Sequence, residues 1–210
     1  MQKPLVRRLM PLVWSLVVAI ALIMALTWGV LQVQVTLAGF LNSESVWSKA
    51  QKQAVIDLDL YASTGAAPDL AGFWNNFGLL DADRRGRDAI TSGNYEKDEI
   101  SKTFKRGNVM PAAQSGMIFM LQYFSGAPHM RQAIAAWRST DASIAELGTI
   151  AEKLNKLYQA GGPSAAEIAS QRARIHALNA YMAPRTNLFS VEMVKGALLL
   201  GFILFWGVLG

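Results

Sequence analysis

The sequence has no cysteine and only two histidines, and both shortages restrict its chemistry. Without cysteine there is neither a disulfide framework nor a thiolate metal site. A zinc site needs three or four converging ligands. Neither His129 nor His176 has a second candidate ligand three or four residues further along the chain. We therefore expect no bound metal, and we interpret His129, beside Pro128, as a residue at the start of a helix.

Motifs of common catalytic sites are missing as well. The chain contains no G-x-S-x-G, no P-loop and no H-E-x-x-H sequence. Neighbouring carboxylates such as Asp57 and Asp59 lie in stretches typical of a solvated helix face. We expect no catalytic residue and no cofactor in this part of the protein.

Charge is absent from residues 9–42, and the first part of this stretch is apolar on all helical faces. A hydrocarbon core about 30 Å thick needs roughly 20 such residues as a helix. The apolar core is longer than that of a signal peptide, and no small-residue cleavage pattern follows it. We interpret residues 9–34 as an uncleaved transmembrane helix.

Acidic residues are also absent from the N-terminal tail, which carries Lys3, Arg7 and Arg8. The positive-inside rule places residues 1–8 in the cytoplasm and the following region, residues 35–194, in the periplasm. Residues 196–210 are again uncharged. As a helix they span about 22 Å, which is shorter than a bilayer. We expect a second transmembrane helix from residue 195 and a cytoplasmic output domain beyond it.

The net charge of +5 does not indicate a nucleic-acid partner. Part of the excess lies in the N-terminal tail, and no basic stripe with interleaved aromatic residues occurs, as a single-strand binder needs. The region between the apolar ends shows three-four spacing of apolar residues and no sustained alternation. The predicted fold class is therefore all-α, with transmembrane helices flanking a periplasmic helical bundle.

Individual helices follow from the breaks in this spacing. A helix over residues 45–63 continues the first span and stops at Gly65. Short helices are expected at residues 69–77, after Asp81, and after Asn94 up to Gly107. Pro111 opens an apolar, buried helix. Residues 130–158 form the longest soluble helix, unless Ser143 and Glu146 restart it, since Asp141 falls on its apolar seam. Ser164 and Glu167 form a capping box, and Pro184 kinks or interrupts the last helix.

A cluster of three arginines is the main candidate site. Arg84, Arg85 and Arg87 near a helix start can hold a carboxylate or phosphate through paired hydrogen bonds. The alternative is that they pair with Asp81, Asp83 and Asp88, facing water or in a buried network. Several aromatic residues either wall a pocket or belong to the core: Trp47, Trp74, Phe77, Tyr123 and Trp137.

Several segments together resemble a known class of protein region. These are WSKAQKQA at residues 47–54, Y-A-x-x-G at 61–65, D-R-R-x-R at 83–87, G-N at 107–108, G-M-I at 116–118 and M-x-x-A-I-x-x-W at 130–137. The set is similar to the N-terminal periplasmic sensory region of bacterial membrane-bound signalling proteins. These are chiefly GGDEF-type diguanylate cyclases, some with EAL domains, and hybrid sensor histidine kinases. Residues 94–109 depart from the Gly-Asn-His-Pro-like turn expected there.

The resemblance implies a sensor module of the bacterial inner membrane, multi-pass and with a periplasmic domain. It would act in a homodimer, bind an unknown periplasmic ligand or protein, and regulate a cytoplasmic domain, foremost a diguanylate cyclase. Trp47, Lys49 and Trp137 lie in the resembling segments and complete the candidate ligand set with the three arginines. The alternative function is a periplasmic protein-binding or assembly module of a membrane complex that passes no signal.

Overall fold

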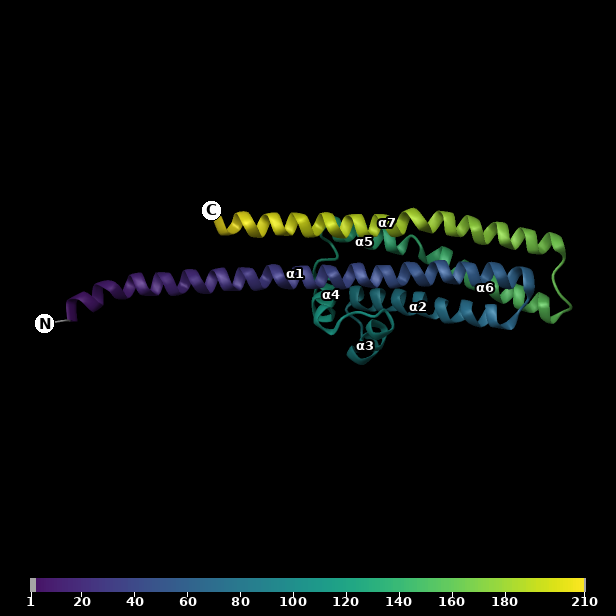
Figure 1. The fold of residues 1–210 in the computed structure, drawn as a ribbon, viewed down its shortest axis with the longest axis horizontal. Helices are drawn as coiled ribbons and strands as arrows, with labels where there is room; N and C mark the ends of the chain where they lie inside the picture. The colour runs from purple at the N-terminus through teal and green to yellow at the C-terminus, as the bar shows by residue number, and fades with distance from the viewer. Residues whose placement is uncertain (1–2, 210) are drawn as a thin grey trace.

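The computed structural model describes residues 3–209, with side chains for residues 9–203 and 206. This described part is all-α, as the sequence predicts. Seven helices follow one another along the chain (Figure 1): α1 (Lys3–Thr64), α2 (Ala67–Ser92), α3 (Lys97–Arg106), α4 (Pro111–Tyr123), α5 (Pro128–Arg138), α6 (Asp141–Gln159) and α7 (Ala165–Leu209).

Helix α1 runs without a break through 62 residues, about 93 Å at 1.5 Å per residue. The predicted continuation of the first apolar segment into the soluble region is therefore confirmed. The helix ends where Gly65 adopts a φ of 66°, a left-handed conformation that glycine adopts without steric cost. The Tyr158 ring packs against this glycine and leaves no room for a side chain there.

Helix α7 begins with the predicted capping box. The Ser164 amide donates to Glu167 Oε2 at 2.8 Å, and the Glu167 amide donates to Ser164 Oγ at 3.3 Å. Of the two predicted effects of Pro184, a kink or an interruption of this helix, the interruption is wrong, because α7 continues through it. Neighbouring carbonyls accept bonds from side chains: Arg185 Nη1 donates to Tyr181 O at 2.7 Å, and Thr186 Oγ1 donates to the carbonyl of the residue four positions earlier.

Helices α1 and α7 lie side by side and run in opposite directions, so both chain ends lie at the same end of the molecule (Figure 1). Helix α2 packs along α1, α5 packs against α7, and α4 crosses α1. Their buried side chains form two clusters. The far cluster is centred on Leu58, Phe73, Leu147 and Ile175, and the near cluster, closer to the chain ends, is centred on Phe40, Ile90, Met117, Ile134 and Phe189.

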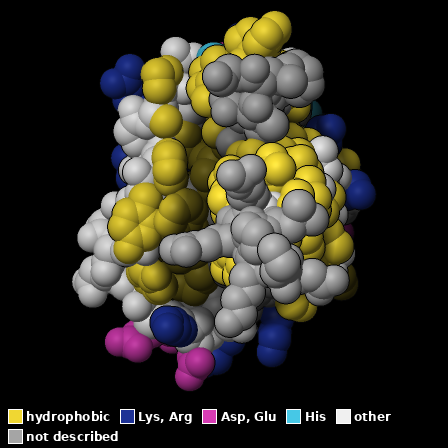
Figure 2. All heavy atoms as spheres, turned by 90° about the vertical axis from the view of Figure 1, so that its left-hand side faces the viewer, with side chains coloured by type: hydrophobic (Ala, Val, Ile, Leu, Met, Phe, Trp, Pro, Cys, Tyr) yellow, Lys and Arg dark blue, Asp and Glu magenta, His cyan; other side chains and the backbone are white. Residues whose placement is uncertain are grey.

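Two helices are long and apolar enough to cross a membrane, by length and composition. Their most apolar windows have mean hydropathies of 2.6 in α1 and 1.3 in α7, and no residue of the α1 window is buried. Figure 2 views the molecule from the end where these helices project, and hydrophobic side chains are prominent on that face. A mostly apolar cleft of ≈ 690 Å³ opens there between the helices, with Trp28, Phe119, Met193 and Ile203 among its lining residues.

The predicted boundaries of the apolar ends fall partly outside the described residues. Residues 1–2 and 210 are not described, and neither are the side chains of Lys3, Arg7 and Arg8. Within the described part, α1 is exposed from Leu9 onward and becomes buried at Thr36, where it meets α4.

Three helix predictions need correction. Residues 69–77 and the segment after Asp81 belong to the single helix α2. Asp81 does not cap a new helix, because its carboxylate lies inside α2 and pairs with Arg84 and Arg85 one turn later. Helix α3 starts at Lys97 after an N-cap at Glu96 rather than at Asn94.

Helix α4 begins at Pro111 as predicted, but it is buried along one face only. Its C-terminal aromatic side chains remain outside the core: Phe119 is 52% and Tyr123 67% exposed. The long helix predicted at residues 130–158 is divided at Ser139 and Thr140, ahead of the alternative restart. Thr140 Oγ1 donates to the Trp137 carbonyl at 2.7 Å, and Asp141, rather than Ser143, opens α6.

Candidate ligand-binding pocket

A pocket lies inside the near cluster, where helices α1, α2, α3, α4, α5 and α7 meet. Its cavity volume is ≈ 40 Å³, and it is partly open to the outside. Most of its wall is apolar. The side chains that give it chemical character are Trp47 and Glu44 from α1, Asp83 and Arg87 from α2, Trp137 from α5, Thr140, and Arg185 from α7.

Two long helices supply their lining residues at helical spacing. Helix α1 contributes Phe40, Ser43, Glu44 and Trp47, and α2 contributes Asp83, Gly86, Arg87 and Ile90. Positions i, i+3, i+4 and i+7 lie on one face of a helix. Each helix therefore turns one stripe toward the pocket, and the polar members of both stripes face the same space.

Arg87 is the largest fully buried side chain, with 1% of its surface exposed. Its Nη1 donates to Asp141 Oδ1 at 3.1 Å and its Nη2 to Asp141 Oδ2 at 2.6 Å. Its Nε and Nη2 also donate to the two carboxylate oxygens of Asp88, at 3.0 and 3.2 Å. Burial disfavours the charged guanidinium, but these hydrogen bonds outweigh it and raise the pKa of Arg87.

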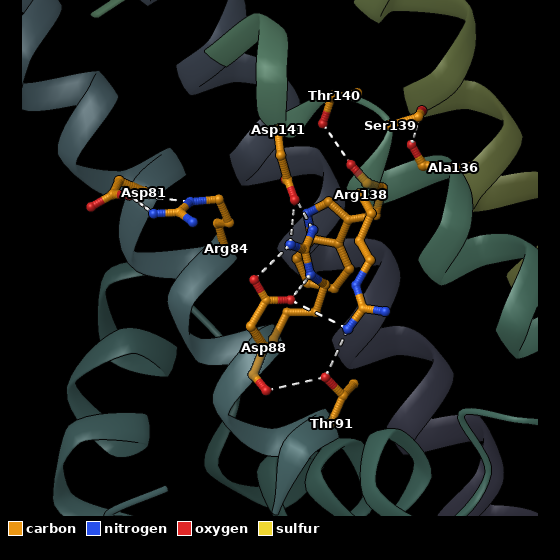
Figure 3. Close-up of polar contacts among 11 residues, drawn as sticks. Asp81, Arg84, Asp88, Thr91, Ala136, Arg138, Ser139, Thr140 and Asp141 are labelled. Carbon is orange, nitrogen blue, oxygen red and sulfur yellow. Dashed lines mark hydrogen bonds and ion pairs between the residues drawn. The ribbon is translucent and has the colours of Figure 1, made fainter. Parts of the chain in front are cut away.

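Figure 3 shows how Asp88 and Asp141 converge on one point from α2 and α6. Arg138 extends beside them and donates to Asp88 Oδ1 at 3.4 Å and to Thr91 Oγ1 at 3.1 Å. Burial raises the pKa of Asp88, but the hydrogen bonds from Arg87 outweigh it, so this pKa lies below its usual range. The Arg87 guanidinium carbon also lies 5.0 Å from the Trp137 ring centroid, within cation–π range. Arg87 is thus held in place by four hydrogen bonds to neighbouring carboxylates.

Asp83 lies one turn before Arg87 and has a different environment. It lines the pocket, and it takes part in no hydrogen bond or ion pair among the residues with described side chains. Burial raises the pKa of its carboxyl to about 7, and the nearby Arg87 charge offsets this only in part.

Trp47 supplies a second unpaired group. Its side chain is 5% exposed, and its indole Nε1 is the single buried side-chain nitrogen or oxygen without a partner in the described part of the chain. A buried donor left without an acceptor costs roughly 1–3 kcal/mol. The pocket thus presents one unpaired donor and one unpaired carboxyl.

The candidate site residues taken from the sequence divide into two groups. Trp47, Arg87 and Trp137 line the pocket, whereas Lys49 is exposed on another face of α1. Arg84 and Arg85 point away from the pocket and pair with Asp81 at 2.7 and 3.0 Å (Figure 3 shows the Arg84 pair). The structure therefore does not gather the three arginines into one anion site. Of the other aromatic candidates, Trp74 and Phe77 pack on the far cluster and Tyr123 is exposed.

Sequence reasoning missed the roles of Asp83 and Asp141. It considered Asp83 only as one possible partner of the three arginines, and it noted Asp141 as a polar residue on an apolar seam without finding its partner. An aspartate at such a position is itself a signal, because a buried carboxylate needs a buried cation. Among the residues with described side chains, no group of three His, Asp or Glu is placed to hold a metal ion.

Comparison with known proteins gives no relative. No family model matches the chain, no curated protein is significantly similar to it, and no solved structure matches its fold.

Proposed function

We propose that this chain is a membrane-anchored input module: its helical domain binds a ligand in the pocket and thereby regulates a cytoplasmic signalling domain. The single observation that supports this is the composition of the pocket. Its wall includes Trp47 of α1 and Arg185 of α7, the two helices that also carry the apolar ends. Two of its lining residues also carry groups without a hydrogen-bond partner, the buried indole N–H of Trp47 and the carboxyl of Asp83, which a ligand could satisfy.

The membrane part of the proposal rests on the exposed apolar ends of α1 and α7. Phe119, Tyr123 and Phe124 form an exposed aromatic group at the end of α4. Phe119 and Phe124 line the same cleft as Trp28 of α1. Aromatic side chains gather at the level of lipid headgroups, so we place the membrane surface here. Lys3, Arg7 and Arg8 orient the N-terminus toward the cytoplasm and the helical domain toward the periplasm of a bacterial inner membrane.

Signal transfer would use the contact between α1 and α7. Beyond the pocket these helices are joined by polar pairs: Gln51 Nε2 donates to Asn179 Oδ1 at 2.9 Å, and Arg172 Nη2 donates to Asp59 Oδ2 at 2.8 Å. A ligand that prefers one packing of the pocket shifts the population of that packing. The resulting displacement of α7 against α1 would cross the membrane within two continuous helices. We propose that the module works as a homodimer and that a diguanylate cyclase is the first output domain to examine.

The proposal is tested by joining residues 1–210 to a reporter cyclase and measuring product formation in membranes. Two pocket variants, Trp47→Phe and Asp83→Leu, are compared with Lys49→Gln and Arg84→Gln, whose side chains lie outside the pocket. Trp47→Phe removes the indole N–H and retains an aromatic ring. We expect the pocket variants to change output several-fold and the two controls to match the parent.

Equal output from all four variants, with each protein folded in the membrane, would contradict a signalling role. It would favour the other function class, an assembly module that binds a periplasmic protein. The exposed aromatic group on α4 is the surface such a partner would use.

A further inference from the structure

The chemistry of the pocket indicates which ligands it accepts, and this inference rests on the function proposed above. Its polar groups differ in whether they have hydrogen-bond partners within the protein. Arg87 uses four of its five N–H groups in bonds to Asp88 and Asp141. The indole N–H of Trp47 and the carboxyl of Asp83 have no partner. A ligand therefore gains most by offering an acceptor to Trp47 and a donor to Asp83.

The charges around the pocket point to the sign of the ligand. Arg87 and Arg138 balance Asp88 and Asp141, with which they pair. Glu44 of α1 and Arg185 of α7 also line the pocket and carry opposite charges. Asp83 is the carboxyl left over, so the ionised pocket has an excess of one negative charge. An anionic ligand would add a second negative charge beside it.

The walls favour an organic cation over a metal ion. Five aromatic side chains line the pocket, from α1, α3, α5 and α7: Phe40, Trp47, Phe104, Trp137 and Phe189. Aromatic ring faces attract alkylammonium groups, and a neighbouring carboxylate completes the recognition of their charge. Hard metal ions instead need several oxygen ligands, and the pocket offers only Asp83 and Glu44 as carboxylates.

The size of the pocket limits the ligand. Its cavity volume of ≈ 40 Å³ lies far below the roughly 300–1,000 Å³ that is typical of sites for drug-sized ligands. We therefore expect a ligand of only a few non-hydrogen atoms.

We infer that the pocket binds a small oxygen-bearing ammonium compound, with its charged nitrogen at the Asp83 carboxylate, its alkyl groups between the aromatic rings, and its oxygen accepting the N–H of Trp47. Amino alcohols and small methylated ammonium compounds have this chemistry. Such a ligand would satisfy both unpaired groups at once.

Proton release is a consequence of this binding mode. The free protein holds a proton on Asp83 up to neutral pH, because burial raises its pKa, and a cation binds only the ionised form. The charged groups that face Asp83 from the surrounding helices are Arg87, Glu44 and Arg185, and no histidine lines the pocket. Affinity should therefore increase between pH 6 and pH 8.

The test measures binding to the full chain in lipid nanodiscs by calorimetry, with methylammonium and ethanolamine as probes. Ethylene glycol serves as the neutral counterpart of ethanolamine, and acetate serves as an anion of similar size. We expect saturable binding of at least one ammonium probe, several-fold tighter at pH 8 than at pH 6, and no binding of ethylene glycol or acetate.

Variants assign the contacts. Asp83→Asn should weaken binding at least tenfold and remove its pH dependence, Trp47→Phe should weaken it several-fold, and Arg84→Gln should have no effect. Absence of binding by every ammonium probe, or equal binding of ethylene glycol, would overturn the inference. Unchanged affinity in Asp83→Asn would overturn it as well.

The two experiments together distinguish a failure of the inferred ligand class from a failure of the proposed signalling function. If Trp47→Phe and Asp83→Leu change cyclase output but no ammonium probe binds, the ligand class is wrong and the signalling role remains. If a probe binds at Asp83 but neither the probe nor the variants alter output, the ligand class is right and the signalling role is wrong.

Discussion

Arg87 and Asp141 lie 54 residues apart in the sequence and form a two-bond ion pair, with N–O distances of 3.1 and 2.6 Å. The pair joins the C-terminal part of α2 to the first turn of α6, and its arginine side chain is fully buried. The pair therefore fixes the position of α2, which forms one wall of the pocket, relative to α6.

Removal of the Asp141 carboxylate should destabilise the protein strongly. Asp141→Leu leaves the buried Arg87 with Asp88 as its remaining partner, and we expect a loss of about 3 kcal/mol in the free energy of unfolding. The double variant Arg87→Met/Asp141→Leu removes both charges and should regain most of this loss. Denaturant unfolding followed by circular dichroism measures both. A double variant as unstable as Asp141→Leu alone would show that the pair does not act as a unit.

Trp137 should contribute to stability through packing and through its contact with Arg87. It is half-buried, and its ring packs edge-on against Phe189 with centroids 5.4 Å apart. Trp137→Ala should cost about 3 kcal/mol, the lower end of the range for large aromatic residues. Thermal unfolding of the full chain provides the measurement. A loss below about 0.5 kcal/mol would mean that the ring does not belong to the core.

The crossing of α1 and α4 should not tolerate a methyl group. A Cβ atom at Gly116 would overlap Thr36 Oγ1 and lie 3.1 Å from Thr36 Cβ. We expect Gly116→Ala to destabilise the protein by about 1–2 kcal/mol, because overpacking outweighs the gain in helix propensity. Gly78→Ala is the matched control: it lies inside α2 with no atom within 4 Å, and it should stabilise by about 0.5–1 kcal/mol. Equal effects of the two substitutions would contradict the close approach.

The Asp83 carboxyl should make stability depend on pH. Burial raises its pKa from 3.8, the value of an unperturbed aspartate, to about 7 in the folded protein. Between these values the folded state binds more protons than the unfolded state, so stability falls as pH rises. Asp83→Asn has no such proton, and its melting temperature should exceed that of the parent by an amount that grows from pH 5 to pH 8. Asp98→Asn, at an exposed position, is the control. A constant difference across this range would contradict the prediction.

Membrane orientation can be read from cysteine labelling, because the natural chain contains no cysteine. Lys52 and Ala160 are exposed and suit this test, whereas Gln51 is 1% exposed and bonded to Asn179. Cysteine at positions 52 and 160 should react with a membrane-impermeant reagent in spheroplasts, and cysteine at position 2 should not. The reverse pattern would overturn the proposed topology.

The sequence predicts the helices better than it predicts their breaks. Helix α1 and the capping box of α7 follow from local signals, the apolar spacing and the Ser164–Glu167 pair. Helix α2 does not, because Asp81 suggests a new N-cap in the sequence, whereas its carboxylate pairs with Arg84 and Arg85 inside one continuous helix. The stop at Thr140 likewise depends on the side chain's bond to the Trp137 carbonyl.

The pocket could be predicted only in part, because it depends on contacts between distant segments. Composition and spacing identify Trp47, Trp137 and the arginines as candidates. They do not show that Arg87 alone turns inward, since this depends on Asp141 arriving from another helix. Nor do they show that Asp83 is left without a partner, because this depends on the side chains that all the surrounding helices place around it.

Pro184 gives α7 a mechanical property that α1 lacks beside the pocket. Proline removes one backbone hydrogen bond from the helix ladder, and here it lies directly before the pocket residues Arg185 and Thr186. From this point to Leu209 the helix is about 38 Å long. A bend of about 5° at Pro184 would move its far end sideways by about 3 Å over that length. A bend at Pro184 would therefore displace residues 185–209 of α7 relative to α1.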